Sequence, residues 1–342
     1  MKKIYFNINI LKAVAIIIVI IEHSKWTNSI WRIGLFPFWD RIAIPCFMAI
    51  SGYVYSNAIQ RDGSIKEYYS KKNLFRRIKR YLLPFVIAYF IEIIAYYICA
   101  NTNVINLFNF NTNNDFYSYF KIINIFEGFV IGGYGPGNYY TPVIIQLVLI
   151  FPLLYKLVKK YKYKALAGSF AFCFLFEIIQ YRFGFSNLLY RSLICRHVFN
   201  ISFGIYIYLG YWKKNKILNF LSMLVGFIYI IAHSYYGYTP YFFYKGFADV
   251  NFVACLFFMP IVGYLICRKD IKCRFLESIG KASYHIYLTQ MVYYNFIKKE
   301  LIMSIIGNNY LYAIINVIIC VSIGYLFYLF NNKLVNICSK TT

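Results

Sequence analysis

Apolar stretches of about the length of one membrane crossing recur along the chain and alternate with short polar segments. A helix needs about 20 predominantly apolar residues to cross a bilayer. The stretches lie at 8–25, 41–59, 81–100, 138–157, 165–182, 193–211, 217–235, 249–267, 279–297 and 309–330. This pattern predicts an all-α polytopic membrane protein, built as a bundle of about ten transmembrane helices.

The composition supports this prediction. Hydrophobic residues make up 61% of the chain and charged residues only 14%, whereas a soluble domain carries roughly 25% charged residues. This shortfall excludes a water-soluble enzyme, a disordered chain and a collagen-like chain. The sequence contains no internal repeat, which weakens the case for an inverted-repeat transporter. We expect one integral-membrane domain over residues 1–342, with no appended soluble domain.

The net charge of +24 would indicate a nucleic-acid partner in a soluble protein. Here the segments on the N-terminal side of the membrane hold 24 Lys and Arg residues and those on the opposite side hold 9. Cytoplasmic segments are the ones enriched in Lys and Arg. The distribution therefore predicts that both termini are cytoplasmic, and it explains much of the charge without nucleic acid. The most basic segment, 60–80, is then a cytoplasmic loop.

The longest polar segment, 101–137, is extracytoplasmic in this topology. It begins with an Asn-rich stretch, Asn101 to Asn114, and ends in the run Gly132-Gly133-Tyr134-Gly135-Pro136-Gly137. Glycine permits tight turns and close backbone contacts. The run therefore fits a re-entrant turn or a close backbone approach, and it fits a plain connector equally well.

Two polar residues share one face of the first predicted span. Lys12 and His23 are eleven residues apart, which at about 100° per residue places them on one stripe, separated by about 16 Å along the axis. The residues between them are aliphatic. Such a stripe can line a pathway between the two membrane faces, but Lys12 could also extend to the headgroups and His23 could be interfacial. Glu22 lies about 100° around the helix, which favours a supporting or interfacial role.

Four further ionisable residues lie within predicted spans, where a charge is costly and needs a partner. They are Glu92, Glu177, Arg196 and His197. Pairing of Glu92 or Glu177 with Arg196 is the simplest interpretation. The sequence does not show which residues pair.

Two short segments carry polar chemistry beside the spans. The stretch from Leu74 to Pro84 contains Arg76, Arg77, Lys79 and Arg80. It fits a cluster that fixes topology, or an anion clamp, since Arg binds phosphate through two parallel hydrogen bonds. In the second span, the pair Ser51-Gly52 permits close helix packing or a local break.

Taken together, four segments in this order resemble the acyltransferase 3 family of integral-membrane acyltransferases. They are Lys12-x10-His23, Ile44 to Val54, Arg77-x-x-Arg80 followed by Pro84, and Ile279 to Leu288. The stretch 133–152 is also similar to the family's aromatic start of a span. The resemblance covers nearly the whole chain, and the four segments in order are far more specific than any one of them.

The chain departs from the family pattern at two positions. Lys12 replaces an Arg, which keeps the charge and loses the planar fork. Gln290 stands where the family often has a His, so no role of that His can be transferred. His285 is an additional polar residue at a variable position, which fits a packing or substrate-side group.

The resemblance implies acyl transfer from cytoplasmic acyl-CoA, with acetyl-CoA expected, to a hydroxyl of a cell-surface or exported polysaccharide or other glycan. His23 is then the general base that removes the proton of the acceptor hydroxyl. An acyl-histidine relay is the alternative. Lys12 would hold the donor by charge.

The resemblance also implies a donor site at the cytoplasmic mouth of the pathway. Arg76, Arg77 and Arg80 are expected to bind the CoA phosphates. Ser51 and Tyr284, which belong to the matching segments, are expected to contribute to the same site. We expect no metal, because the nine cysteines form no CxxC pair and most lie in apolar runs, where they act as packing residues.

The expected location is the cell membrane, crossed several times. The expected partners are the lipid bilayer and the glycan acceptor, not nucleic acid. Because no hydrolase-like domain is fused to the chain, a separate extracytoplasmic partner protein could complete the pathway. The alternative function is a polysaccharide flippase, exporter or polymerase. Such a protein should carry charges spread over many spans, without the basic R-x-x-R segment.

Overall fold

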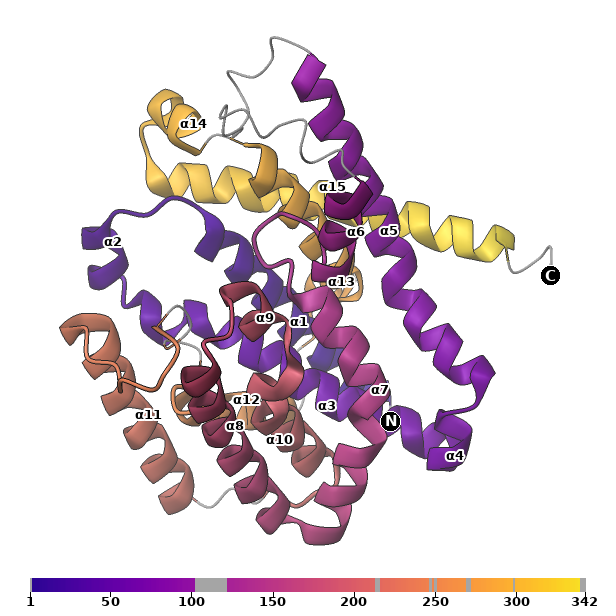
Figure 1. Cartoon of the computed structure of the whole chain (residues 1–342), viewed down its shortest axis with the longest axis vertical. Helices are drawn as coiled ribbons and strands as arrows, with labels where there is room; N and C mark the ends of the chain where they lie inside the picture. The colour runs from indigo at the N-terminus through magenta and orange to yellow at the C-terminus, as the bar shows by residue number, and fades with distance from the viewer. Residues whose placement is uncertain are drawn as a thin grey trace.

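The computed structural model describes residues 2–101, 122–212, 216–245, 248, 251–268, 272–297 and 299–338. Within these ranges every regular element is a helix, so the all-α prediction is confirmed (Figure 1). Most of the Asn-rich start of segment 101–137 lies outside the described residues.

Each of the ten predicted spans contains a helix. The long helices are α1 (Lys2–His23), α3 (Ala43–Asp62), α5 (Lys71–Asn101), α7 (Tyr140–Tyr161), α8 (Tyr163–Phe183), α11 (Lys216–Tyr236), α12 (Cys255–Cys267), α13 (Arg274–Phe296) and α15 (Asn309–Cys338). The short helices are α2 (Asn28–Ile33), α4 (Ile65–Tyr68), α6 (Ile122–Ile131), α9 (Asn187–Ser192), α10 (Val198–Tyr208) and α14 (Lys299–Ile306). Short 3₁₀ turns lie at Phe36–Phe38, Asp40–Ile42 and Ile194–His197.

Six helical segments are long and apolar enough to cross a membrane, by length and composition. They are Phe36–Asp62, Lys71–Ile98, Tyr140–Tyr161, Tyr163–Phe183, Lys216–Tyr236 and Asn309–Ile337. The predicted polytopic character is therefore confirmed. The remaining predicted spans differ for local reasons. The helix in 193–211 is only α10, with 11 residues. The helix in 249–267 is α12, with 13 residues, and α13 buries several polar side chains.

The basic segment 60–80 is more helical than the sequence pattern predicts. Asp62 ends α3, the single-turn helix α4 follows, and α5 already begins at Lys71. Lys, Arg and Leu are good helix formers, so nothing in 71–80 stops the helix before the membrane span. The Arg side chains of this stretch consequently have fixed positions around the first turns of α5.

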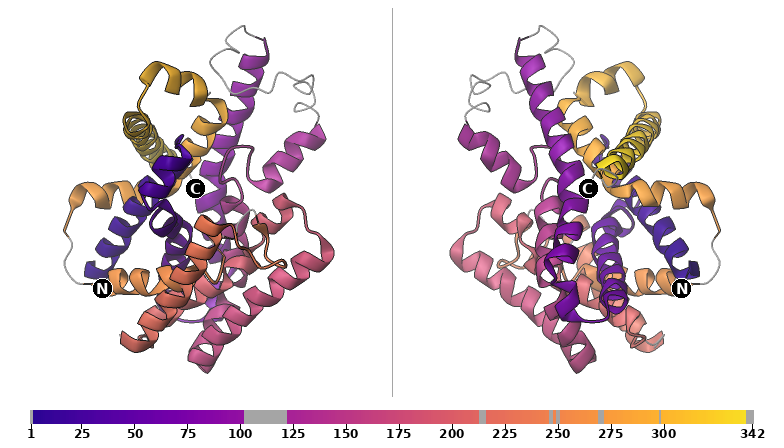
Figure 2. Two further views of the ribbon diagram at one scale, coloured as in Figure 1. Left: turned by 90° about the vertical axis from the view of Figure 1, so that its left-hand side faces the viewer. Right: turned by 90° about the vertical axis from the view of Figure 1, so that its right-hand side faces the viewer.

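Helix α1 lies between two hydrophobic cores. One core joins α3, α7, α8, α10 and α12, and the other joins α5, α13 and α15. Alternate faces of α1 contribute to both, with Leu11 in the first core and Ile16 in the second. Figure 1 shows the first group of helices below α1 and the second group above it, and the side views in Figure 2 agree. The polar stripe of α1 therefore runs along the seam between the two groups.

Glycines bring the helices around this seam into backbone contact. A Cβ atom on Gly280 of α13 would lie 1.7 Å from the carbonyl oxygen of Asn9 on α1. A Cβ atom on Gly52 of α3 would lie 2.2 Å from the carbonyl oxygen of Ile201 on α10. Helix α3 is continuous through Ser51-Gly52. That pair therefore serves close packing, as small residues do between membrane helices, and does not break the helix.

Replacing Gly280 by Ala is expected to destabilise the protein by about 1–3 kcal/mol, because the added methyl group forces α1 and α13 apart. Gly168→Ala on α8 is the matched control, since a Cβ atom there meets nothing within 4 Å. That control should be neutral or stabilising by up to about 1 kcal/mol. Thermal unfolding of both variants in the same detergent measures the difference. Equal melting temperatures would contradict the close contact between α1 and α13.

Candidate active site

A cavity of about 1460 Å³ opens along the seam, between α1, α3, α5, α7, α13 and α15. All seven residues that the sequence analysis selected line this one cavity. They are Lys12, His23, Ser51, Arg76, Arg77, Arg80 and Tyr284. Side chains from segments far apart in the sequence are thus brought to one continuous space.

The cavity follows the stripe of α1 that contains Lys12 and His23. Ile16 and Val19, which lie between these two residues on the same face, line it as well. Helix α13 runs parallel to α1, since Gly280 meets Asn9 near one end and the Tyr294 hydroxyl donates to the Ile20 carbonyl oxygen, 2.8 Å away, near the other. We call the region around Arg76 and Arg80 the basic end and the opposite region the His23 end.

Positive charge dominates the cavity wall. Among the described residues, ten Lys and Arg side chains line it and one carboxylate, Glu22, does so. The cations are Lys12, Arg41, Arg61, Lys72, Arg76, Arg77, Lys79, Arg80, Arg191 and Lys281. Walls of one sign in a low-dielectric surrounding concentrate ligands of the opposite sign. The cavity is therefore suited to a strongly anionic ligand.

Arg77 is held by protein contacts at the corner between α3, α4 and α5. Its guanidinium forms an ion pair with Asp62 and donates a hydrogen bond to the carbonyl oxygen of Tyr68, at 3.0 Å. The same guanidinium lies over the Tyr68 ring, 3.9 Å from the ring centre. The side chain is buried. Arg77 thus fixes the backbone that presents the neighbouring arginines.

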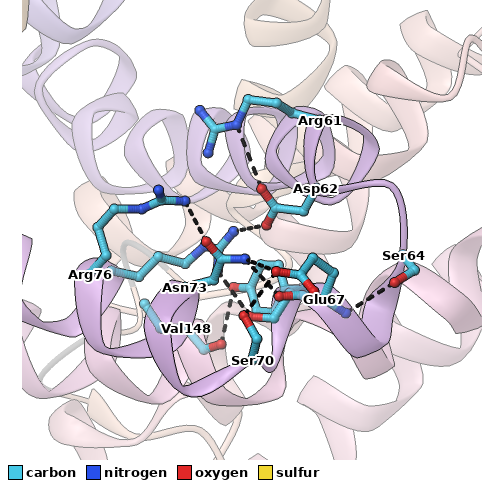
Figure 3. A network of polar contacts seen from close by, with 10 residues as sticks. Arg61, Asp62, Ser64, Glu67, Ser70, Asn73, Arg76 and Val148 are labelled. Atoms are coloured by element: carbon cyan, nitrogen blue, oxygen red, sulfur yellow. Dashed lines mark hydrogen bonds and ion pairs between the residues drawn. The ribbon is translucent and has the colours of Figure 1, made fainter.

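Arg76 and Arg80 are exposed at the basic end. Arg76 donates to the side-chain oxygen of Asn73 at 2.7 Å, and Asn73 in turn donates to Glu67 at 2.9 Å. Figure 3 shows this network, in which Arg61 also contacts Asp62. Arg80 has no hydrogen bond or ion pair with any described residue. The same holds for Lys12, so both cations are available to a ligand.

At the His23 end, the imidazole is packed edge-on against the Tyr294 ring, with ring centres 5.9 Å apart. The Tyr294 hydroxyl bonds to the Ile20 carbonyl oxygen and lies 3.1 Å from the Ser24 hydroxyl. Lys299 donates to the backbone carbonyl oxygen of His23 at 2.6 Å, which satisfies an end carbonyl of α1. Among the described residues, no hydrogen bond engages the His23 ring nitrogens, so they can meet a ligand.

Sequence reasoning missed two arginines of the His23 end. Arg41 forms an ion pair with Glu22 and lies 3.6 Å from Asp40, and both Arg41 and Glu22 line the cavity. Arg191, on α9, also lines it. In the sequence both arginines stand in polar segments that the charge count treats only as topology signals, so nothing local indicated a site.

Tyrosines form the wall between the two ends. The Tyr284 hydroxyl donates to the carbonyl oxygen of Tyr81 at 3.1 Å, and the Tyr81 and Tyr284 ring centres are 5.2 Å apart. Tyr140 and Tyr287 continue this wall, with ring centres 5.1 Å apart. An aromatic wall of this kind gives an extended ligand a largely apolar passage with a few polar contacts.

The Gly-rich run makes a close backbone approach, which decides between the alternatives that the sequence left open. A Cβ atom on Gly135 would lie 2.2 Å from the carbonyl oxygen of Met291 on α13. The buried Glu92 carboxylate accepts a hydrogen bond from the Tyr134 amide at 3.3 Å and one from Asn295 at 2.7 Å. Pro136 and Gly137 line the cavity. Glu92 therefore holds a turn that forms part of the cavity wall.

The other ionisable residues of the spans pack away from the cavity. Glu177 accepts hydrogen bonds from the Tyr190 hydroxyl and from the Tyr244 amide, and Arg196 lies over the Tyr190 ring. The carboxylates thus bond to tyrosine and asparagine groups, so the direct pairing with Arg196 considered above is wrong. His197 is buried beside Arg196.

The seven described cysteines form no disulfide. Within the described ranges, no group of three or more His, Cys, Asp or Glu side chains could hold a metal ion.

The family model described as an acyltransferase domain matches residues 5–329 of this sequence. The chain belongs to the acyltransferase 3 family. The resemblance found in the four segments is thereby confirmed, and the match contains the whole cavity wall except Asn331, Asn332 and Val335. Membership of the family supports acyl transfer by a multi-pass membrane enzyme. Searches of curated proteins and of solved structures found no match.

Proposed function

We propose that this membrane acyltransferase moves an acyl group, with acetyl expected, from acyl-CoA to a hydroxyl of a cell-surface or exported glycan. One observation carries the proposal. A single cavity is lined by exposed arginines at one end and by a histidine without a hydrogen-bond partner among the described residues at the other. Such a cavity can hold an anionic donor and an acceptor hydroxyl at opposite ends of the same space.

The donor binds at the basic end in this proposal. The phosphates of CoA are the anionic part of the donor, and arginine is the residue best suited to bind phosphate. Arg80 and Arg76 present exposed guanidinium groups there, and Lys12 adds a cation deeper in the cavity. The distance of about 16 Å from Lys12 to His23 is then bridged by the extended arm that carries the thioester.

The reaction occurs at the His23 end. His23 takes the proton of the acceptor hydroxyl while the oxygen attacks the thioester carbonyl carbon. A C–O bond forms, the C–S bond breaks, and the proton on His23 passes to the departing thiolate. In the alternative relay, a His23 ring nitrogen first takes the acyl group and releases the thiol, and the acceptor hydroxyl attacks afterwards.

The proposed setting is the cell membrane, with both termini in the cytoplasm. The excess of Lys and Arg on one side of the predicted topology supports this orientation. It puts the basic end at the cytoplasmic face, where acyl-CoA is found, and the His23 end at the outer face. A separate extracytoplasmic protein could carry the acylated product onward.

The function is tested with purified protein, radiolabelled acetyl-CoA and a surface glycan isolated from cells that lack this chain. We expect release of free CoA together with label on the glycan. A protein that moves glycan across liposome membranes and leaves acetyl-CoA intact is the result that favours the flippase, exporter or polymerase. Absence of transfer from every acyl-CoA tested overturns the proposal.

The arginines of the basic end should differ in what they contribute. Arg80→Gln should raise the KM for acyl-CoA by roughly 3- to 10-fold, since an exposed cation without a protein partner is lost to the donor. Arg77→Gln should instead lower the melting temperature, because it leaves the Asp62 carboxylate buried without its partner. Initial rates over a range of acyl-CoA concentrations, with thermal unfolding alongside, separate the two effects. An unchanged KM in Arg80→Gln would contradict the donor site.

A further inference from the structure

Two buried polar side chains line the middle of the cavity without full hydrogen bonding. His285 and Gln290 of α13 are 7% and 0% exposed. Among the described residues, both ring nitrogens of His285 and the Oε1 atom of Gln290 have no hydrogen-bond partner. Buried polar atoms are almost always hydrogen-bonded, because an unpaired one costs free energy. A polar group of the ligand is the partner that the cavity can supply.

Both side chains lie between the cation and the histidine of α1. From the contact of Gly280 with Asn9, the parallel helices place His285 about 3 Å beyond Lys12 toward the His23 end. By the same count Gln290 lies about 6 Å short of His23. The two residues therefore belong to the stretch that an extended donor must pass through, and neither is at the phosphates or at the reacting carbonyl.

The surroundings of each side chain hold it in place. The His285 ring meets Phe327 and Tyr328 edge-on, with ring centres 5.1 and 5.3 Å away. The Gln290 side-chain nitrogen contacts the carbonyl oxygen of Pro136 at 3.4 Å, and its oxygen is left as an acceptor. A neutral imidazole offers one N–H donor and one acceptor. Together the pair presents one donor and two acceptors along the cavity.

We propose that His285 and Gln290 form a binding subsite for the amide groups of the donor's arm, and that this subsite selects a pantetheine thioester. The inference rests on the proposed function, because it assumes an acyl-CoA donor. An amide N–H of the arm donates to Oε1 of Gln290, and an amide carbonyl oxygen accepts from the ring N–H of His285. Such bonds can hold the arm extended, with the thioester directed toward His23.

The test compares two donors that share the arm. Acetyl-CoA carries the phosphates and the nucleotide, whereas acetylpantetheine carries the arm alone. We expect His285→Phe and Gln290→Leu each to raise the KM for both donors by roughly 3- to 10-fold, the effect of losing one hydrogen bond. Arg80→Gln should raise the KM for acetyl-CoA only. His285→Asn, which keeps a donor and an acceptor, should recover part of the loss.

The readout does not depend on how much protein folds, since KM is independent of the amount of active enzyme. His233→Phe on α11 is the matched control, because His233 bonds to Thr239 at 2.8 Å and is absent from the cavity wall. An unchanged KM for acetylpantetheine in both cavity variants, with wild-type transfer intact, overturns the subsite and leaves the proposed function standing. A wild-type protein that transfers from no acyl-CoA overturns both.

Discussion

Replacing His23 by Ala should reduce acyl transfer by roughly 10²- to 10⁴-fold, which is the usual contribution of a positioned general base. The side chain lies at the end of the cavity opposite the arginines, and no described residue bonds to its ring nitrogens. The expected loss is in kcat, since the donor is bound elsewhere. Transfer from acyl-CoA, measured in membranes matched for protein amount, gives the result.

His233→Ala is the control for the loss of a histidine from a helix, because His233 lies outside the cavity wall. The His23→Ala protein should still insert, since removal of one polar group from a span does not oppose insertion. Near-normal transfer by His23→Ala would remove the assignment of His23 and most of the proposed mechanism. A stable acyl group on wild-type His23, trapped without acceptor, would favour the relay over the general base.

Replacing Lys12 by Leu should weaken donor binding by roughly 10- to 100-fold, the effect of losing a charge-assisted contact in a water-poor site. Lys12 has no hydrogen bond or ion pair with any described residue, so its charge is not used by the protein itself. Lys12→Arg should keep most of the activity, because it preserves the cation at the same depth. The KM for acyl-CoA, compared among the three proteins, measures the effect.

The double variant Lys12→Leu/His23→Ala separates a shared pathway from two independent effects. Residues that act as a unit are strongly non-additive. The double variant should therefore be hardly slower than His23→Ala alone. A loss equal to the product of the two single losses would show that Lys12 and His23 act independently. Activity of Lys12→Leu equal to wild type would support the alternative in which Lys12 only extends toward the headgroups.

Much of the fold could be predicted from local features of the sequence. Apolar runs fix which segments can be helices in a membrane, because no water is available there to bond the backbone. The spacing of Lys12 and His23 alone places both residues on one stripe, since helix geometry is regular. The helical extent of the basic stretch was harder to predict, because Lys71 to Arg80 has good helix propensity but no hydrophobic signal.

The contacts between segments could not be read from local patterns. Glu92 and Glu177 needed partners on energetic grounds, yet their partners, Asn295 and Tyr190 among them, lie on other helices. Arg76, Arg77 and Arg80 are equivalent by charge. The ion pair with Asp62 makes Arg77 structural, and the absence of a described partner leaves Arg80 free. Such differences depend on which helices meet.

The sequence by itself determined the helical membrane class, the family and the two ends of a polar stripe on the first span. These properties depend on composition, periodicity and short motifs, which are local along the chain. Only the tertiary structure decided that the stripe lines a cavity shared with the arginines of α5 and with His285 and Gln290 of α13. The physical reason is close packing. Glycine contacts such as Gly280 against Asn9 set how near the helices approach and in which register, and this fixes which side chains face one space.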